Sequence, residues 1–184
     1  RILGADKWKR IVKSSVYLSG TMNTADRSLA GLDIALRRRF TFKEMPPKPE
    51  LLDEISVEGL NIGTLLRTMN QRIEVLLDRD HCLGHAYFLP LEKDNTLERL
   101  AFIFRQQILP LLQEYFFEDW ERIAWILNDH SKPTASQFIQ PASNNIDKLF
   151  GEKADNLKNI RRWRINESAF TLLDSYRGIL GAGA

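Results

Sequence analysis

Apolar residues recur at helical spacing through the middle of the chain. Between Leu60 and Asp78 they fall on one face of a helix, which predicts an amphipathic helix there. A second helical pattern opens with the capping box Asn95-x-x-Glu98 and runs to about Phe117. Pro110 lies inside it and is expected to kink or split the helix, because proline has no backbone N–H. A third pattern, Trp120 to Leu127, predicts another helix.

The pattern weakens after residue 127. Residues 128–145 are mostly polar and predict a loop. Asn166 is expected to cap a last helix from Glu167 to Arg177, which Gly178 ends. Aromatic side chains in the preceding helical patterns are expected in the core, and these are Phe116, Phe117, Trp120 and Trp125.

The first part of the chain has a different pattern. Val16 to Met22 is rich in β-forming residues and ends in the polar tip Asn23 to Asp26. A helical pattern follows from Leu29 to Arg39, and Phe40 to Met45 then alternates apolar and polar as a strand does. Strand, polar tip, helix and strand form part of an α/β unit, and such sheets hold ligands beyond the carboxyl ends of their strands.

The net charge changes sign near residue 50, where the hydrophobic pattern also changes. The net charge is +7 over residues 1–49, −8 over residues 50–130 and +3 over residues 131–184. The first change of sign falls on the proline-rich segment Pro46 to Pro49, which cannot continue a helix. We therefore expect an α/β piece in residues 1–49, a helical region in 50–130 and a C-terminal extension of loop and helix in 131–184.

Composition narrows the class of protein. Apolar residues make up 43% and charged residues 27% of 184, which indicates a folded globular protein. A single cysteine excludes a disulfide framework and fits a reducing compartment such as the cytoplasm. No apolar run is long enough for a membrane span, and no membrane partner is expected. Because the chain begins with Arg1, it is expected to be a piece of a longer protein.

Two polar groups in the first 49 residues could carry chemistry. At a strand tip, Asn23 could orient a water molecule and contact a phosphate, and Asp26 could hold an arginine or a base edge. The same residues also suit an ordinary turn, and both readings stay open. Arg37, Arg38 and Arg39 end the predicted helix, where one cation favours the helix dipole. Three in a row also fit arginines that stabilise a transferring phosphate.

These residues carry a family resemblance. Residues 17–29, Tyr-Leu-Ser-Gly-Thr-Met-Asn-Thr-Ala-Asp-Arg-Ser-Leu, and the following Leu32 to Phe40 resemble McrB-like AAA+ GTPase subunits of the modified-cytosine-dependent restriction system. Gly84 to Phe88 and Ile108 to Phe117 are similar to the helical lid of that family. The resemblance implies an α/β fold, namely the C-terminal part of an AAA+ P-loop domain, followed by a mainly α-helical lid.

The resemblance also implies roles for individual residues. Asn23 would be the sensor that positions the attacking water, and Arg38 and Arg39 would reach the nucleotide of a neighbouring subunit. Asp26, Arg27 and Arg37 would act at the subunit interface or as sensors. Gly84 and His85 would lie near the edge of the nucleotide base.

The family further implies cofactors and partners for a full-length protein. They are Mg²⁺ with GTP or ATP, further copies in a ring of about six subunits, a separate nuclease subunit, and DNA bound through an upstream module. No Gly-x4-Gly-Lys-Ser/Thr loop occurs in the chain, so this chain alone is predicted to be inactive as an NTPase. A generic AAA+ ATPase and a nucleotide-independent adaptor remain alternatives.

Two further motifs invite a chemical interpretation. His81-Cys82-x-x-His85 offers two or three metal-ligand side chains, but the chain shows no nearby fourth ligand, and a lid turn is the simpler interpretation. No metal site is predicted. Leu51 to Glu54 resembles the end of a Walker B strand, yet it follows the sensor region and is expected to be a solvated helix end.

Overall fold

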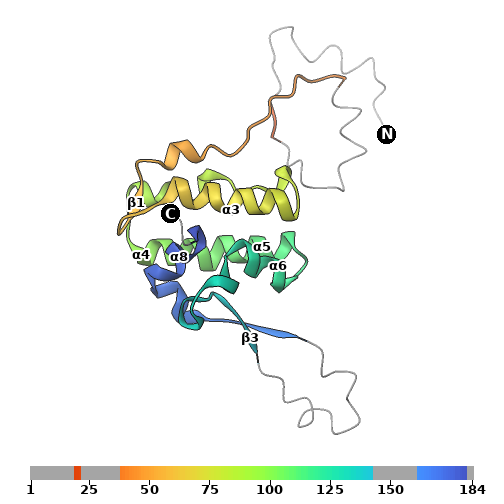
Figure 1. Cartoon of the computed structure of the whole chain (residues 1–184). Helices are drawn as coiled ribbons and strands as arrows, with labels where there is room; N and C mark the ends of the chain where they lie inside the picture. The colour runs from red at the N-terminus through yellow and green to blue at the C-terminus, as the bar shows by residue number, and fades with distance from the viewer. Residues whose placement is uncertain (1–18, 22–37, 143–160, 182–184) are drawn as a thin grey trace, which may run out of the picture. The chain divides into compact units, whose positions relative to one another are not determined.

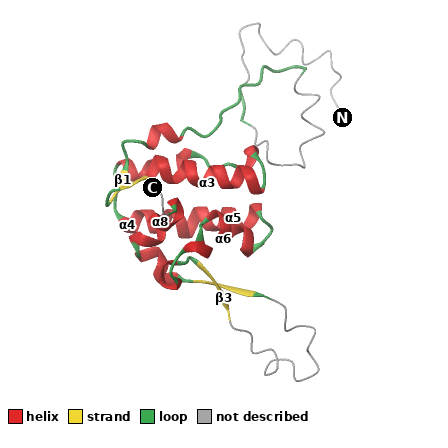
Figure 2. Cartoon of the chain, viewed as in Figure 1, coloured by secondary structure: helices red, strands yellow, loops and turns green. Residues whose placement is uncertain are grey.

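The computed structural model describes residues 19–21, 38–142 and 161–181. The chain forms two compact units, residues 1–42 and 43–184. Helices dominate the described part of the second unit, and its strands are short (Figure 2). Its α-helices are α3 (Ile62–Leu76), α4 (Leu97–Ile103), α5 (Leu109–Tyr115), α6 (Trp120–Ile126) and α8 (Leu173–Leu180). The mainly helical character expected for this part of the chain is therefore confirmed.

Short elements connect these helices. β1 (Ser56–Val57) pairs antiparallel with β2 (Leu60–Asn61), and β3 (Ile139–Ala142) pairs antiparallel with β4 (Arg162–Ile165). Single turns of 3-10 helix occur at Pro49–Leu52, Arg79–His81, His85–Tyr87, Leu89–Glu92, Asp129–Ser131, Thr134–Ser136 and Glu167–Thr171. Among the described residues, no helix is long and apolar enough to cross a membrane.

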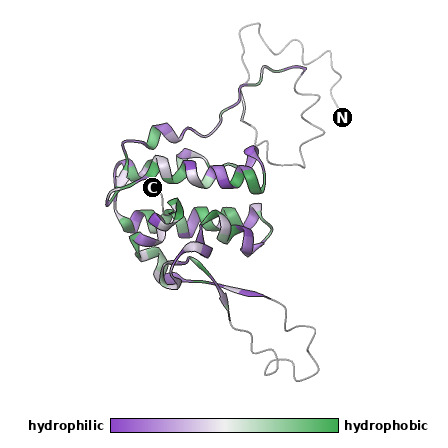
Figure 3. Ribbon diagram, in the orientation of Figure 1, coloured by the Kyte–Doolittle hydropathy of each residue, from purple (hydrophilic) through white to green (hydrophobic). Residues whose placement is uncertain are grey.

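Helix α3 confirms the amphipathic pattern read from the sequence. Asn61 caps it by accepting a hydrogen bond from the backbone N–H of Thr64 at 2.7 Å. Figure 3 shows apolar residues interrupted by polar ones along this helix. Its buried side contacts α6 and α8, which lie across from it in Figure 1. The buried apolar side chains of α3 are Ile62, Leu65, Leu66, Met69 and Ile73.

The helical run around Pro110 is interrupted, and the form of the interruption is informative. Residues Phe104–Ile108 form a π-helical segment between α4 and α5. The helix is therefore wider over this one segment and then continues as α5. Pro110 then lies at the start of α5, where the missing N–H costs least. The cap at the other end differs from the prediction: Thr96, rather than Asn95, accepts the hydrogen bond from the N–H of Arg99.

The described residues after position 131 share one core with the helices. The ring of Phe104 stacks on Phe138 at 5.8 Å and meets Tyr176 edge-on at 4.9 Å. Phe170 packs against Phe138 at 5.1 Å and accepts a hydrogen bond at its carbonyl from the Tyr176 hydroxyl at 2.8 Å. Burial raises the pKa of Tyr176, which fits a phenol that remains a neutral donor.

Several sequence predictions are wrong in the structure. The strand expected at Phe40 to Met45 is absent: residues 41–48 form neither helix nor strand. Residues 128–142, expected as a loop, contain two 3-10 turns and strand β3. The helix expected from Glu167 is a 3-10 turn followed by α8, and the side chain of Asn166 does not cap it.

Two aromatic residues expected in the core are exposed. Phe116 is buried and Trp120 packs against the core, as predicted. Phe117 is 92% exposed and adopts φ 50° in the turn that follows α5. Trp125 lies on the outer side of α6 and packs against the His130 ring at 3.8 Å.

Candidate functional site: the lid turn and the polar seam

The turn after α3 is where the sequence places the edge of a nucleotide site. Asn70, buried on α3, fixes this turn by bonding both backbone groups of Leu83. Its side-chain oxygen accepts from the Leu83 N–H at 2.7 Å, and its amide donates to the Leu83 carbonyl at 3.0 Å. One polar side chain in the helix therefore sets the path of the chain toward Gly84 and His85.

His81 is held inside the turn by its own neighbours. The Asp78 carboxylate accepts from the backbone N–H of Asp80 and of His81 and lies 2.7 Å from the His81 ring nitrogen Nδ1. Partial burial alone would raise the pKa of Asp78, but these hydrogen bonds and His81 leave it lowered. The Tyr115 ring meets the His81 ring edge-on at 4.9 Å. These contacts give His81 a structural role.

Among the described residues, the His85 ring forms one hydrogen bond, through Nδ1. It follows Gly84 at the start of a 3-10 turn, and its Nδ1 accepts a hydrogen bond from the Lys48 backbone N–H at 3.1 Å. A ring that accepts at Nδ1 carries its proton on Nε2, which leaves an N–H donor on the other side. A second contact nearby, an ion pair between Arg79 and Glu44, also joins this turn to the segment that enters the lid.

His81 and His85 make different contacts in the structure. They occupy separate 3-10 turns, Arg79–His81 and His85–Tyr87, and bond to different partners. Within the described ranges, no group of three His, Cys, Asp or Glu side chains is placed to hold a metal ion. Burial raises the pKa of the intervening Cys82 thiol.

Most of the residues predicted to act on the nucleotide lie outside the turn that holds Gly84 and His85. Asn23, Asp26, Arg27 and Arg37 lie outside the described residues. Arg38 and Arg39 are exposed in a turn that belongs to the unit of residues 1–42, whereas Gly84 and His85 belong to the unit of residues 43–184. The catalytic and interface roles remain predictions.

Asp53, in the segment that resembles a Walker B ending, makes structural contacts. It follows the 3-10 helix Pro49–Leu52, and its carboxylate accepts from the Arg67 guanidinium at 2.6 Å. Its carbonyl accepts from the Asn61 side chain at 2.7 Å. The hydrogen bond from Arg67 lowers the pKa of Asp53. This carboxylate therefore holds the entering segment against α3.

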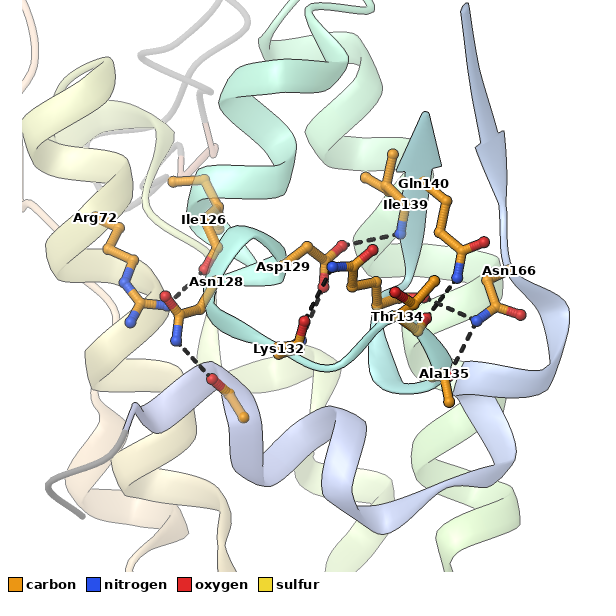
Figure 4. A network of polar contacts seen from close by, with 12 residues as sticks. Arg72, Ile126, Asn128, Asp129, Lys132, Thr134, Ala135, Ile139, Gln140 and Asn166 are labelled. Atoms are coloured by element: carbon orange, nitrogen blue, oxygen red, sulfur yellow. Dashed lines mark hydrogen bonds and ion pairs between the residues drawn. The ribbon is translucent and has the colours of Figure 1, made fainter. Parts of the chain in front are cut away.

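A polar seam that the sequence reading missed joins the C-terminal elements to the helices (Figure 4). We use polar seam for Arg72, Asn128, Asp129, Lys132 and Gln140. Arg72 on α3 donates to the Ile126 carbonyl at 2.9 Å, and the Asn128 amide donates to the Gly178 carbonyl at 2.7 Å. Asn128 adopts φ 59°, a left-handed conformation that asparagine tolerates. The one hint of this conformation in the sequence is that an asparagine follows directly after the predicted helix that ends at Leu127.

The centre of the polar seam is a buried ion pair. Lys132 and Asp129 are joined at 3.0 Å, and both side chains are 2% exposed. The second carboxylate oxygen of Asp129 accepts from the Ile139 N–H at 2.9 Å, and the Lys132 ammonium lies 4.4 Å from the Phe138 ring centre. Burial lowers the pKa of Lys132 to about 8 and raises the pKa of Asp129, each against the opposing attraction of its partner.

Comparison with known proteins defines the class of this helical region. Residues 61–124 match the model of the McrB alpha-helical lid domain. This range begins at the cap of α3 and ends inside α6. Over these residues the chain is thus similar to the helical lid of McrB.

A curated relative extends the likeness beyond the lid. The chain is 36% identical over 129 residues to the type IV methyl-directed restriction enzyme EcoKMcrB subunit of Escherichia coli strain K12. The match covers 62% of this chain and 28% of that relative, so the chain spans well under a third of the relative's length. The resemblance to McrB-like proteins is confirmed. The α/β part of the expected fold lies mainly outside the described residues.

Proposed function

We propose that this chain is the sensor, arginine and lid portion of a McrB-like AAA+ NTPase subunit that hydrolyses GTP or ATP with Mg²⁺. The observation that carries the proposal is the match of residues 61–124 to the McrB lid, preceded in the chain by Asn23 and the arginine triplet in family order. The relative's name describes a restriction enzyme subunit, so the work driven by hydrolysis would be DNA restriction with a separate nuclease subunit.

The chemistry divides between two parts of the subunit. Transfer of a phosphoryl group spreads negative charge over oxygens that a fixed guanidinium stabilises. In a ring, Arg38 and Arg39 would supply that charge to a neighbour's nucleotide, and both residues are exposed, which is consistent with this role. The lid would cover the base, with the Nε2–H of His85 as a donor to its edge.

The first experiment measures phosphate release by the full-length protein that contains this chain. GTP and then ATP are supplied with Mg²⁺ over a range of protein concentrations. Turnover with GTP that rises steeply with concentration supports a ring with shared sites. Turnover on ATP alone would replace the proposal with a generic AAA+ motor, and no turnover on either would favour an adaptor.

Two variants test the assigned residues. Arg39→Ala is expected to lower hydrolysis at least about tenfold with nearly unchanged nucleotide affinity, because a trans-acting arginine contacts the transition state. Arg122→Ala, which removes an exposed arginine of α6, is the matched control. His85→Ala is expected to raise KM more than it lowers kcat. Equal losses of hydrolysis and affinity in Arg39→Ala would contradict a trans-acting role.

A further inference from the structure

The ribbon of β3 and β4 has two chemically different faces. Residues paired across an antiparallel ribbon share a face, and alternate residues along each strand point to opposite faces. Gln140 pairs with Arg164 and Ala142 with Arg162, which defines one face; Ile139 pairs with Ile165 and Pro141 with Trp163, which defines the other. Ile139 is buried in the core and Trp163 packs against it. Ile139 and Gln140 at the base of the ribbon are both buried, whereas the side chains of Arg162 and Arg164 are exposed.

Within the described part of the chain, the arginine face has no carboxylate partner. Arg162 and Arg164 are exposed, and no carboxylate in residues 38–142 or 161–181 forms an ion pair with either. Arg161, at the start of β4, is different, because it pairs with Glu121 at 3.1 Å. Two residues along a strand span about 7 Å, so the guanidinium groups of Arg162 and Arg164 can reach different anionic groups of one polymer.

The base of the ribbon is held in place by the polar seam. Gln140 is 5% exposed, and its amide donates to the Thr134 carbonyl. Its side-chain oxygen accepts from both Nε and a terminal nitrogen of Arg164, at 3.3 and 2.8 Å. The side chain of Asn166, just after β4, donates to the carbonyls of Ala135 and Gln137. Arg164 is thus oriented by a neutral partner that leaves its charge unpaired.

We propose that the arginine face of the β3–β4 ribbon, Arg162 with Arg164, binds the phosphate backbone of double-stranded DNA. A guanidinium presents paired N–H donors that match phosphate oxygens, and a two-stranded ribbon has the width to enter a major groove. The two strands leave the helical body in Figure 1, and polar residues colour their outer part in Figure 3.

The test measures binding of the 184-residue chain to a fluorescent 20-base-pair duplex, without nucleotide, from about 50 to 200 mM salt. The double variant Arg162→Gln/Arg164→Gln is compared with Arg99→Gln/Arg122→Gln, which removes the same charge from exposed positions on α4 and α6. The ribbon variant is expected to bind at least about fivefold more weakly. The slope of log affinity against log salt should fall by one to two, because each lost phosphate contact removes about 0.9.

A third variant separates charge from architecture. Arg162→Lys/Arg164→Lys keeps both charges and is expected to retain most of the affinity, even though the two-point contact of Arg164 with Gln140 is lost. Equal weakening in the ribbon and control variants would overturn the proposal, since binding would then follow net charge, including that of the basic residues 1–49. So would a chain that binds anionic vesicles of phosphatidylserine but not the duplex. Binding here is independent of hydrolysis, so either proposal can fail alone.

Discussion

Two aspartates, Asp53 and Asp129, form ion pairs on either side of the main helices, one in an exposed environment and the other in a buried one. Asp53 pairs with Arg67 at 2.6 Å, and the two side chains are 43% and 39% exposed. Asp129 pairs with Lys132 at 3.0 Å, and both side chains are 2% exposed. The exposed pair competes with water and salt, whereas the buried pair has replaced its hydration by protein contacts. We therefore expect the buried pair to contribute more to the stability of the folded chain than the exposed pair.

The largest expected effect comes from removing the buried carboxylate. Asp129→Ala leaves the Lys132 ammonium in an apolar site and the Ile139 N–H without its partner. Loss of one member of a buried pair costs about 3–5 kcal/mol, which urea unfolding followed by circular dichroism would measure. Asp53→Ala should change the midpoint little.

A double variant identifies the source of this loss. Asp129→Asn/Lys132→Met removes both charges and keeps an oxygen to accept from the Ile139 N–H. We expect it to be more stable than Asp129→Ala. If Asp129→Ala unfolded no earlier than Asp53→Ala, the contrast between the two pairs would be wrong.

The second effect is a pH dependence confined to the buried pair. The pKa of Lys132 falls from 10.5 to about 8 on folding, so between these values the unfolded chain retains a proton that the folded chain has released. The free energy of unfolding should therefore rise with pH in this window, by up to about 1.4 kcal/mol per pH unit from this group. Arg67 does not titrate there.

The comparison that isolates this contribution is wild type against Lys132→Met. Other groups titrate in both proteins, so their contributions cancel in the difference between the two unfolding curves. A difference that stayed flat from pH 8 to 10.5 would show that burial does not shift the lysine.

The third effect concerns the packing of the Lys132 stem. A Cβ added to Gly178 would lie 2.8–3.0 Å from three carbons of Lys132, which the ion pair holds in place. Overpacking of this kind costs about 1–3 kcal/mol, and the gain in helix propensity offsets up to about 1 of it. Gly178→Ala should therefore lower the free energy of unfolding by about 1 kcal/mol.

Gly84 provides the matched control for Gly178. It has φ −72°, which alanine adopts, and no atom lies within 4 Å of an added Cβ. Gly84→Ala is expected to be neutral or slightly stabilising, because alanine restricts the unfolded chain. Equal losses in both variants would place the cost in the backbone, against the packing argument.

The sequence predicts the lid well where the determinants are local. The periodic apolar face of α3 and the helical run of α6 are properties of a few consecutive turns, and both are present. The polar seam and the aromatic core are not local: Phe104, Phe138 and Tyr176 meet only after three elements pack together. Alternation at Phe40 to Met45 indicates the capacity to form a strand, but pairing needs a partner strand, which local pattern does not supply.

The candidate site likewise has features that local sequence predicts and features that depend on tertiary contacts. The lid is recognisable because its helices and their spacing carry a family pattern over residues 61–124. The contact of His85 with Lys48 depends on how the chain turns after Asn70, which spacing alone does not determine. The roles of Asn23 and Arg39 follow from resemblance only.

The smallest expected effect is a different response of the two ion pairs to salt. Asp53→Asn and Asp129→Asn each remove one charge and keep the shape of the side chain. Because the Asp53 pair is exposed, salt screens its attraction, and any loss at low salt should vanish at about 0.5 M NaCl. The loss in Asp129→Asn should persist at both salt concentrations, since the pair is shielded from ions. Thermal melting at the two concentrations measures both. If the two variants responded equally to salt, burial would not be what distinguishes the two ends of the lid.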